Sequence, residues 1–109
     1  MTQVTILQGT LDLLILKALS LGELHGLGIA RRIEQVTKGA FQPGPGSLFP
    51  ALHRLERAGL LKSEFGKSET RRDAKYYTLT KKGRRQLKVE SDEWAAVVAA
   101  MRLALESTR

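Results

Sequence analysis

The stretch from Gly46 to Gly83 constrains the fold of this chain most, because a helix pattern in it passes directly into a strand pattern. Ser47 carries a hydroxyl that can cap the first N–H groups of a helix, and Pro50 would then lie in the first turn, where no amide partner is lost. Gly59 is typical of a helix C-terminus. Leucines at the spacing i, i+4 and i+7 predict one buried face: Leu48, Leu52 and Leu55. We therefore expect an amphipathic helix from Ser47 to Gly59.

A strand pattern begins after this helix. Residues 61–65 alternate between charged side chains and Leu, Ser or Phe, and residues 75–79 (KYYTL) have the composition of a strand. The connection over residues 66–74 is polar and basic, so it is too long for a tight turn and too charged to be buried. The two strands are predicted to form a hairpin whose connection projects into solvent as a wing.

Two further helices are predicted before this block. The segment from Thr10 to Ser20 carries apolar residues on all sides and must be buried on most of them, and a second helix extends from about His25 to Val36. A Gly- and Pro-rich link over residues 39–46 leads into the third helix.

The order of these elements predicts the fold class and the domain organisation. The chain is expected to be mainly α with a small β-hairpin, which is an α+β winged helix-turn-helix. Residues 1–80 would form this DNA-binding domain, and residues 81–109 a C-terminal dimerisation helix packed on the same domain. With 109 residues, the chain suits one small domain rather than two.

The segment after Thr80, a candidate helix cap, shows the seam of a coiled coil. The seam recurs at spacings of 4, 3, 4, 3 and 4 with one polar interruption: Leu87, Ser91, Trp94, Val98, Met101 and Leu105. A seam of about three heptads is marginal alone, so we expect it to pair with a second copy, together with the apolar first helix. The residues predicted at this dimer interface are Leu13, Leu16, Leu87, Trp94, Val98, Met101 and Leu105.

Positive charge is concentrated in one part of the chain. The formal net charge is +7, and residues 61–88 alone hold ten basic and three acidic residues. Such a patch is typical of a protein that binds a polyanion, because Lys and Arg release counterions from phosphates. A solvated basic surface is an equal alternative on charge alone, and the neighbouring helix and hairpin favour double-stranded DNA.

Composition argues against an enzyme or a metal site. The absence of cysteine excludes disulfides and thiolate catalysis, and the two histidines, His25 and His53, are too few for a metal cluster. No apolar run is long enough to cross a bilayer, and the N-terminus lacks the pattern of a secretory signal. We expect a cytoplasmic protein that is not an enzyme and needs no cofactor.

The candidate DNA-contacting residues lie on the third helix and on the hairpin. The helix offers five residues where a recognition helix meets base edges and phosphates: Ser47, Phe49, Pro50, His53 and Arg54. The hairpin offers four candidate phosphate contacts: Lys67, Arg71, Arg72 and Lys75. A plain helix cap is the alternative for Ser47, and a core position is the alternative for Phe49.

Four segments resemble the PadR-like transcriptional regulators of bacteria: GTLDLLIL at 9–16, HGLGIARRIE at 25–34, GSLFPALHRLERAGLL at 46–61 and RRDAKYYTLTKKGRRQL at 71–87. The single C-terminal helix is similar to the short, LmrR-like subfamily. The resemblance implies a homodimeric winged-helix repressor on a pseudo-palindromic operator. It also implies that the third helix enters the major groove and that the wing touches the backbone or the minor groove.

The resemblance bears on three further positions. The family often has tyrosine where this chain has Phe49 and Leu27, so no contact that depends on a hydroxyl carries over to either residue. In the similar multidrug-sensing regulator, a tryptophan on the C-terminal helix lines an apolar pore at the dimer interface. Trp94 is therefore a candidate contact for a small aromatic or hydrophobic effector, with dimer packing as its alternative.

A rival function stays open at this point. A winged helix can also serve as a protein-interaction or RNA-binding module without operator specificity, and its basic wing would then face RNA or an acidic partner.

Overall fold

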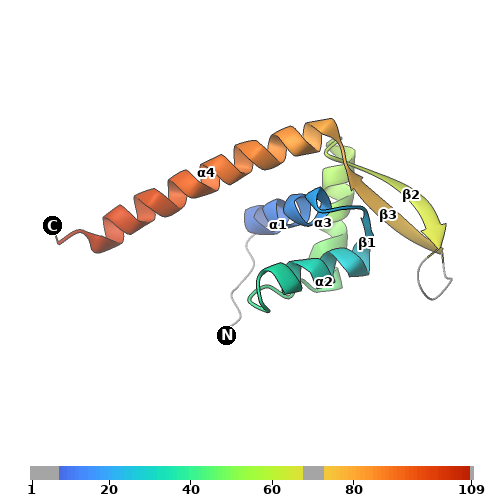
Figure 1. The fold of residues 1–109 in the computed structure, drawn as a ribbon, viewed down its shortest axis with the longest axis horizontal. Coiled ribbons are helices and arrows are strands. Elements are labelled where there is room, and N and C mark those ends of the chain that lie inside the picture. The colour runs from blue at the N-terminus through green and yellow to red at the C-terminus, as the bar shows by residue number, and fades with distance from the viewer. Residues whose placement is uncertain (1–7, 68–72, 109) are drawn as a thin grey trace.

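The computed structural model describes residues 8–67 and 73–108. Within them the elements are α1 (Gln8–Ser20), β1 (Leu24–His25), α2 (Gly26–Val36), α3 (Pro45–Arg57), β2 (Leu61–Lys67), β3 (Asp73–Leu79) and α4 (Lys81–Glu106). Figure 1 shows α1, α2 and α3 grouped together, with the β2–β3 hairpin on one side and α4 extending away on the other. The predicted α+β winged helix-turn-helix with a C-terminal helix is confirmed.

The core lies where the three short helices meet the base of the hairpin. The buried side chains come from every one of these elements: Leu11, Ile15, Leu16, Leu19, Ile29, Ile33, Leu48, Leu52, Leu55, Leu61, Tyr77 and Leu79. The leucine spacing on α3 therefore identified its buried face correctly.

Two residues predicted at a dimer interface belong to this core or pack against it. Leu16 is 0% exposed, so no second copy can reach it. Leu87 is half-buried and packs against the core of its own chain. The physical reason is that α1 is covered within one chain by α2, α3, α4 and β3, which already accounts for its apolar residues on all sides.

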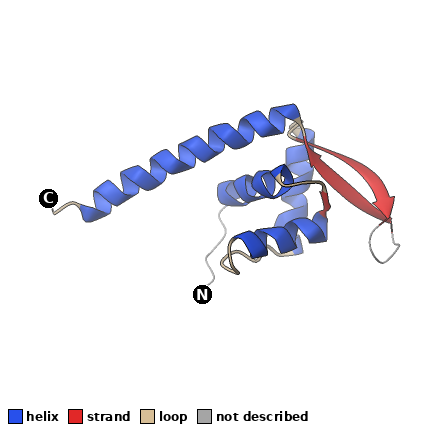
Figure 2. Ribbon diagram, in the orientation of Figure 1, coloured by secondary structure: helices blue, strands red, loops and turns tan. Residues whose placement is uncertain are grey.

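The sheet has one strand more than the sequence indicates. Its strands are antiparallel in the order β1-β3-β2, with the two residues of β1 paired to β3. In Figure 2 all the strands lie at the same end of the helical group. The hairpin is confirmed, and its strands reach Lys67 and Asp73, so the connection is shorter than the predicted one. β1 was not predicted because two residues are too short to show an alternating pattern.

The start of α3 differs from the sequence prediction. The N-cap is Gly44 and Pro45 begins the helix, so Ser47 is its third residue and does not cap it. Pro50 is the sixth residue and lies beyond the first turn. Pro45 explains the earlier start, because its fixed φ is already helical and its missing N–H costs nothing at this position.

Other helix ends follow the sequence signals. Gly59 has a φ of 79° directly after the C-cap of α3, a backbone conformation that favours glycine. Thr80 caps α4 by accepting the N–H of Gly83 at 3.0 Å, and its hydroxyl also donates to the carbonyl of Gly59 at 2.7 Å. Thr80 therefore joins the end of α3 to the start of α4.

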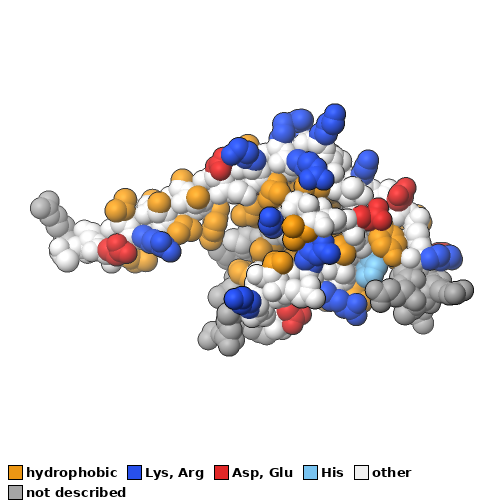
Figure 3. Space-filling model, viewed as in Figure 1, with side chains coloured by type: hydrophobic (Ala, Val, Ile, Leu, Met, Phe, Trp, Pro, Cys, Tyr) orange, Lys and Arg blue, Asp and Glu red, His pale blue; other side chains and the backbone are white. Residues whose placement is uncertain are grey.

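The second half of α4 projects beyond the domain. Six large apolar side chains of α4 lie exposed from residue 89 onward: Val89, Trp94, Val97, Met101, Leu103 and Leu105. Figure 3 shows such side chains along the extended helix, whereas Lys and Arg gather near its beginning. No helix in the described ranges is long and apolar enough to cross a membrane.

Candidate nucleic-acid interface

One face of α3 is open to solvent while the opposite face is buried. Four of the five residues predicted on this helix are exposed: Ser47, Phe49, Pro50 and His53. Leu48, Ala51, Leu52 and Leu55 hold the other face in the core. The exposed face is thus fixed rigidly with respect to the domain.

Phe49 is only partly exposed. Its side chain is 42% exposed. The ring also covers the first turn of α2 so closely that a Cβ at Gly26 would lie 2.7 Å from Cε1 of Phe49. Phe49 therefore packs one part of its ring against α2 and leaves the rest on the open face of α3.

Arg54 does not lie with the other predicted residues. Its guanidinium donates two hydrogen bonds to the carboxylate of Asp12 on α1, at 2.7 and 3.0 Å. The bond to Asp12 raises the pKa of Arg54. Arg54 is therefore a residue of the α1–α3 contact, and the prediction that it points to DNA bases is corrected.

Glu56 ties the hairpin to α3. It accepts a hydrogen bond from the hydroxyl of Ser63 and forms an ion pair with Lys75, whose Nζ lies 3.1 Å from Oε1. The Ser63 hydroxyl and then Lys75 lower the pKa of Glu56, and the hydrogen bond with Glu56 raises the pKa of Lys75. Lys75 therefore anchors the hairpin to α3 through Glu56.

Of the other three predicted wing residues, the structure describes only Lys67. Lys67 is exposed near the end of β2 and forms an ion pair with Asp73 across the hairpin. Arg71 and Arg72 lie outside the described residues.

Two basic residues near α3 are not among the predicted DNA contacts. Arg57 is exposed one turn after His53, and both border a shallow groove together with Glu56. The spacing from Pro50 through His53 to Arg57 follows one helix face and was a signal that could have found it. Lys82 of α4 donates to the carbonyl of Ala58 at 2.8 Å, so it stabilises the C-terminal end of α3.

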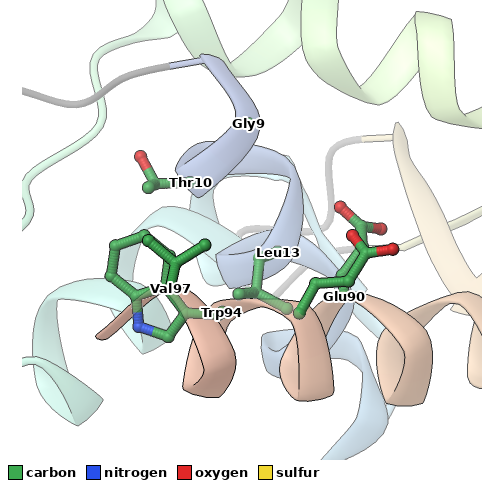
Figure 4. Close-up of a pocket in the computed structure, with 7 residues that line it drawn as sticks. Gly9, Thr10, Leu13, Glu90, Trp94 and Val97 are labelled. Carbon is green, nitrogen blue, oxygen red and sulfur yellow. The ribbon is translucent and has the colours of Figure 1, made fainter. Parts of the chain in front are cut away.

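A separate pocket of about 340 Å³ lies between α1 and α4. It is lined by Gly9, Thr10, Leu13, Glu90, Glu93, Trp94 and Val97. Figure 4 shows Trp94 and Val97 near one end and Glu90 near the other, with Leu13 between them. Burial raises the pKa of Glu90, and the nearby charges of Asp12 and Glu93 add to the effect. The pocket therefore offers an apolar surface beside carboxylates.

No candidate metal site lies within the described residues. Residues 8–67 and 73–108 contain no group of three His, Cys, Asp or Glu side chains that could hold a metal ion.

A three-helix domain with one open helix face beside an antiparallel hairpin defines the class of winged-helix transcriptional regulators. The family model described as "Transcriptional regulator PadR-like family" matches residues 15–89. The chain belongs to this family.

Two solved structures and one further protein are similar to this chain. A transcriptional regulator from Clostridium thermocellum is 29% identical with a TM-score of 0.79, over 87% of this chain and 92% of that one. A PadR family transcription regulator from Clostridium difficile R20291 is 30% identical with a TM-score of 0.75, over 87% and 97%. A protein of Lysinibacillus sphaericus is 28% identical over 106 residues, which is 97% of each chain.

Proposed function

We propose that this protein is a sequence-specific repressor that binds a pseudo-palindromic operator as a homodimer in the cytoplasm. The observation that carries the proposal is the open face of α3, where Ser47, Phe49, Pro50 and His53 lie exposed on a helix anchored to a basic hairpin. A helix held in this way can enter the major groove while the hairpin meets the adjacent backbone. Repression by occupying the operator requires no catalytic step.

The dimer is proposed from α4. Residues 1–80 would act as the DNA-binding domain, and α4 would pair with a second copy. A second copy could cover the exposed apolar residues of α4 together with the half-buried Leu13 and Val98. The interface would comprise Leu13, Trp94, Val98, Met101 and Leu105. A dimer can match two half-sites one helical turn apart, at about 34–36 Å.

An effector is proposed for the pocket between α1 and α4. A small aromatic or hydrophobic compound would lie against Trp94, Leu13 and Val97. Because α4 would also form the dimer contact, a compound bound there can change the separation of the two α3 helices and release the operator.

Titration with duplex DNA from upstream of the protein's own gene tests the proposal. We expect tighter binding to a palindrome in this region than to a scrambled duplex. The affinity should fall by about 0.9 log unit per log unit of salt for each phosphate neutralised. Equal affinity for both duplexes would contradict operator recognition and favour a non-specific module, and a single-stranded RNA of the same sequence tests that rival directly.

A further inference from the structure

Phe65 is the most exposed aromatic side chain in the described part of the chain. It is 78% exposed, against 50% for Trp94 and 42% for Phe49. Phe65 lies on β2, an edge strand of the sheet. Proteins usually cover such an edge or place charges on it, because exposed apolar edges promote aggregation. An exposed ring at this position therefore indicates a partner that residues 8–67 and 73–108 do not provide.

The strand register shows which face of the hairpin carries Phe65. Phe65 lies opposite Lys75, and Ser63 lies opposite Tyr77. Side chains directly opposite each other in an antiparallel pair share one face of the sheet. Ser63 and Lys75 both contact Glu56 of α3, so Phe65 lies on the face of the hairpin that is turned toward α3.

The neighbouring lysines leave the ring uncovered. Lys75 is directed to Glu56, and its Nζ lies 5.5 Å from the centre of the Tyr77 ring rather than over Phe65. Lys67 is paired with Asp73. Within residues 61–67 and 73–79, both ammonium groups are therefore directed to partners other than Phe65, and its ring stays exposed.

We propose that Phe65 packs against the deoxyribose edge of a DNA duplex, on the strand that lies between α3 and the hairpin. This inference rests on the proposed function and deepens it. The charge of this part of the chain favours a duplex over a protein, because His53 and Arg57 are exposed on α3 and the sequence from residue 61 to residue 88 holds ten basic and three acidic residues. Deoxyribose is the apolar part of the backbone, so one strand offers a surface for the ring between phosphates for the cations.

The salt dependence of binding distinguishes the proposed Phe65 contact from the phosphate contacts of basic residues. Removing a phosphate contact lowers the salt dependence of binding, whereas removing an apolar contact does not. Contacts to the sugar carry no sequence information. We therefore expect Phe65→Ala to weaken binding to the palindrome and to the scrambled duplex by the same factor, about tenfold, with an unchanged salt slope.

Two variants serve as controls in the same titrations. Arg57→Ala removes a charge from the α3 face and should lower the salt slope by about one. Val36→Ala truncates an exposed apolar residue at the far end of α2 and should leave both affinities unchanged. Thermal unfolding of all three variants establishes that each remains folded, which the exposure of Phe65 leads us to expect.

The outcomes distinguish this inference from the proposed function. Phe65→Ala with wild-type affinity for both duplexes would overturn the sugar contact while operator binding stands, and so would a loss confined to the palindrome or a changed salt slope. An equal loss on both duplexes would support the contact even if the wild type shows no preference for the palindrome. A wild type that binds no duplex would reject both.

Discussion

Arg54 and Asp12, which are 42 positions apart in the sequence, form a two-bond ion pair that joins α3 to α1, with distances of 2.7 and 3.0 Å. The side chain of Asp12 is mostly buried and that of Arg54 is partly exposed. The pair therefore fixes the helix that carries the proposed DNA-reading face against the helix that lines the α1–α4 pocket.

Loss of this pair should reduce the stability of the domain. We expect Asp12→Asn to lower the free energy of unfolding by about 1 kcal/mol, because Arg54 loses a charged acceptor in a site that water partly reaches. Urea denaturation measures the change. Asp92→Asn removes the exposed pair with Lys88 and should change stability by less than about 0.5 kcal/mol. An equal effect of the two substitutions would contradict the structural role of Asp12.

The Glu56 contacts predict a pH dependence. The folded chain holds the pKa of Glu56 below its ordinary value of 4.5. A lowered pKa adds stability above the pKa of the unfolded chain, and this contribution is lost as the pH falls through the folded pKa. Glu56→Gln should therefore be less stable than the wild type at neutral pH by about 0.5–1 kcal/mol, and the difference should shrink as the pH falls below the ordinary pKa of 4.5. Urea denaturation of both proteins between about pH 3 and about pH 7 tests this prediction. Glu64→Gln, at an exposed position, is the control. A stability difference between Glu56→Gln and the wild type that persists in acid would contradict the prediction.

Gly83 lies where α4 packs against the base of the hairpin. A Cβ at this position would lie 2.2 Å from the carbonyl oxygen of Leu60 and 2.7 Å from Cδ1 of Leu79. Gly83→Ala should cost about 2–3 kcal/mol, although alanine is the better helix former. Gly46→Ala is the matched control, since a Cβ there meets nothing within 4 Å and should stabilise α3 slightly. Thermal unfolding compares them, and a stable Gly83→Ala protein would disprove the packing.

Met101 tests the proposed dimer. Its side chain is 58% exposed on α4, so a charge there is compatible with the folded chain but not with an apolar interface. We expect Met101→Glu to sediment as a monomer that still unfolds cooperatively, at a midpoint no longer dependent on protein concentration. Arg102→Glu changes the neighbouring position and should remain a dimer. A dimeric Met101→Glu protein would exclude this part of α4 from the interface.

Trp94 reports directly on the proposed effector site, because it is the only tryptophan in the sequence. Planar aromatic compounds should quench its fluorescence saturably, and Leu13→Ala should weaken the response by removing part of the pocket wall. Val36→Ala lies away from the pocket and should leave it unchanged. No response across a varied panel would favour packing alone for Trp94.

Local patterns predicted most of the fold. The leucine spacing of α3, the alternation in β2 and the caps at Gly59 and Thr80 each depend on a few neighbouring residues. The early start of α3 is also a local feature, and the residue that sets it is Pro45 rather than Ser47. β1 is too short to leave a pattern, and it exists only because β3 lies beside it.

The candidate site was predicted less completely, because exposure and partners depend on distant contacts. The helix period separated the buried leucines from Ser47, Phe49, Pro50 and His53, and the structure leaves these four exposed. It also extends to Arg57, which is exposed one turn after His53. The period could not show that the guanidinium of Arg54 would turn to Asp12.

By itself, the sequence determined the order of the helices, the hairpin and the concentration of basic residues. Periodicity, caps and charge each depend only on residues that are close together in the sequence. The tertiary structure alone decided which of these side chains are exposed and free to contact another molecule. It placed Leu16 inside the core, paired Arg54 with Asp12 and left Phe65 bare. Burial and ion pairing are set by segments that meet only when the chain folds, so no local pattern could have shown them.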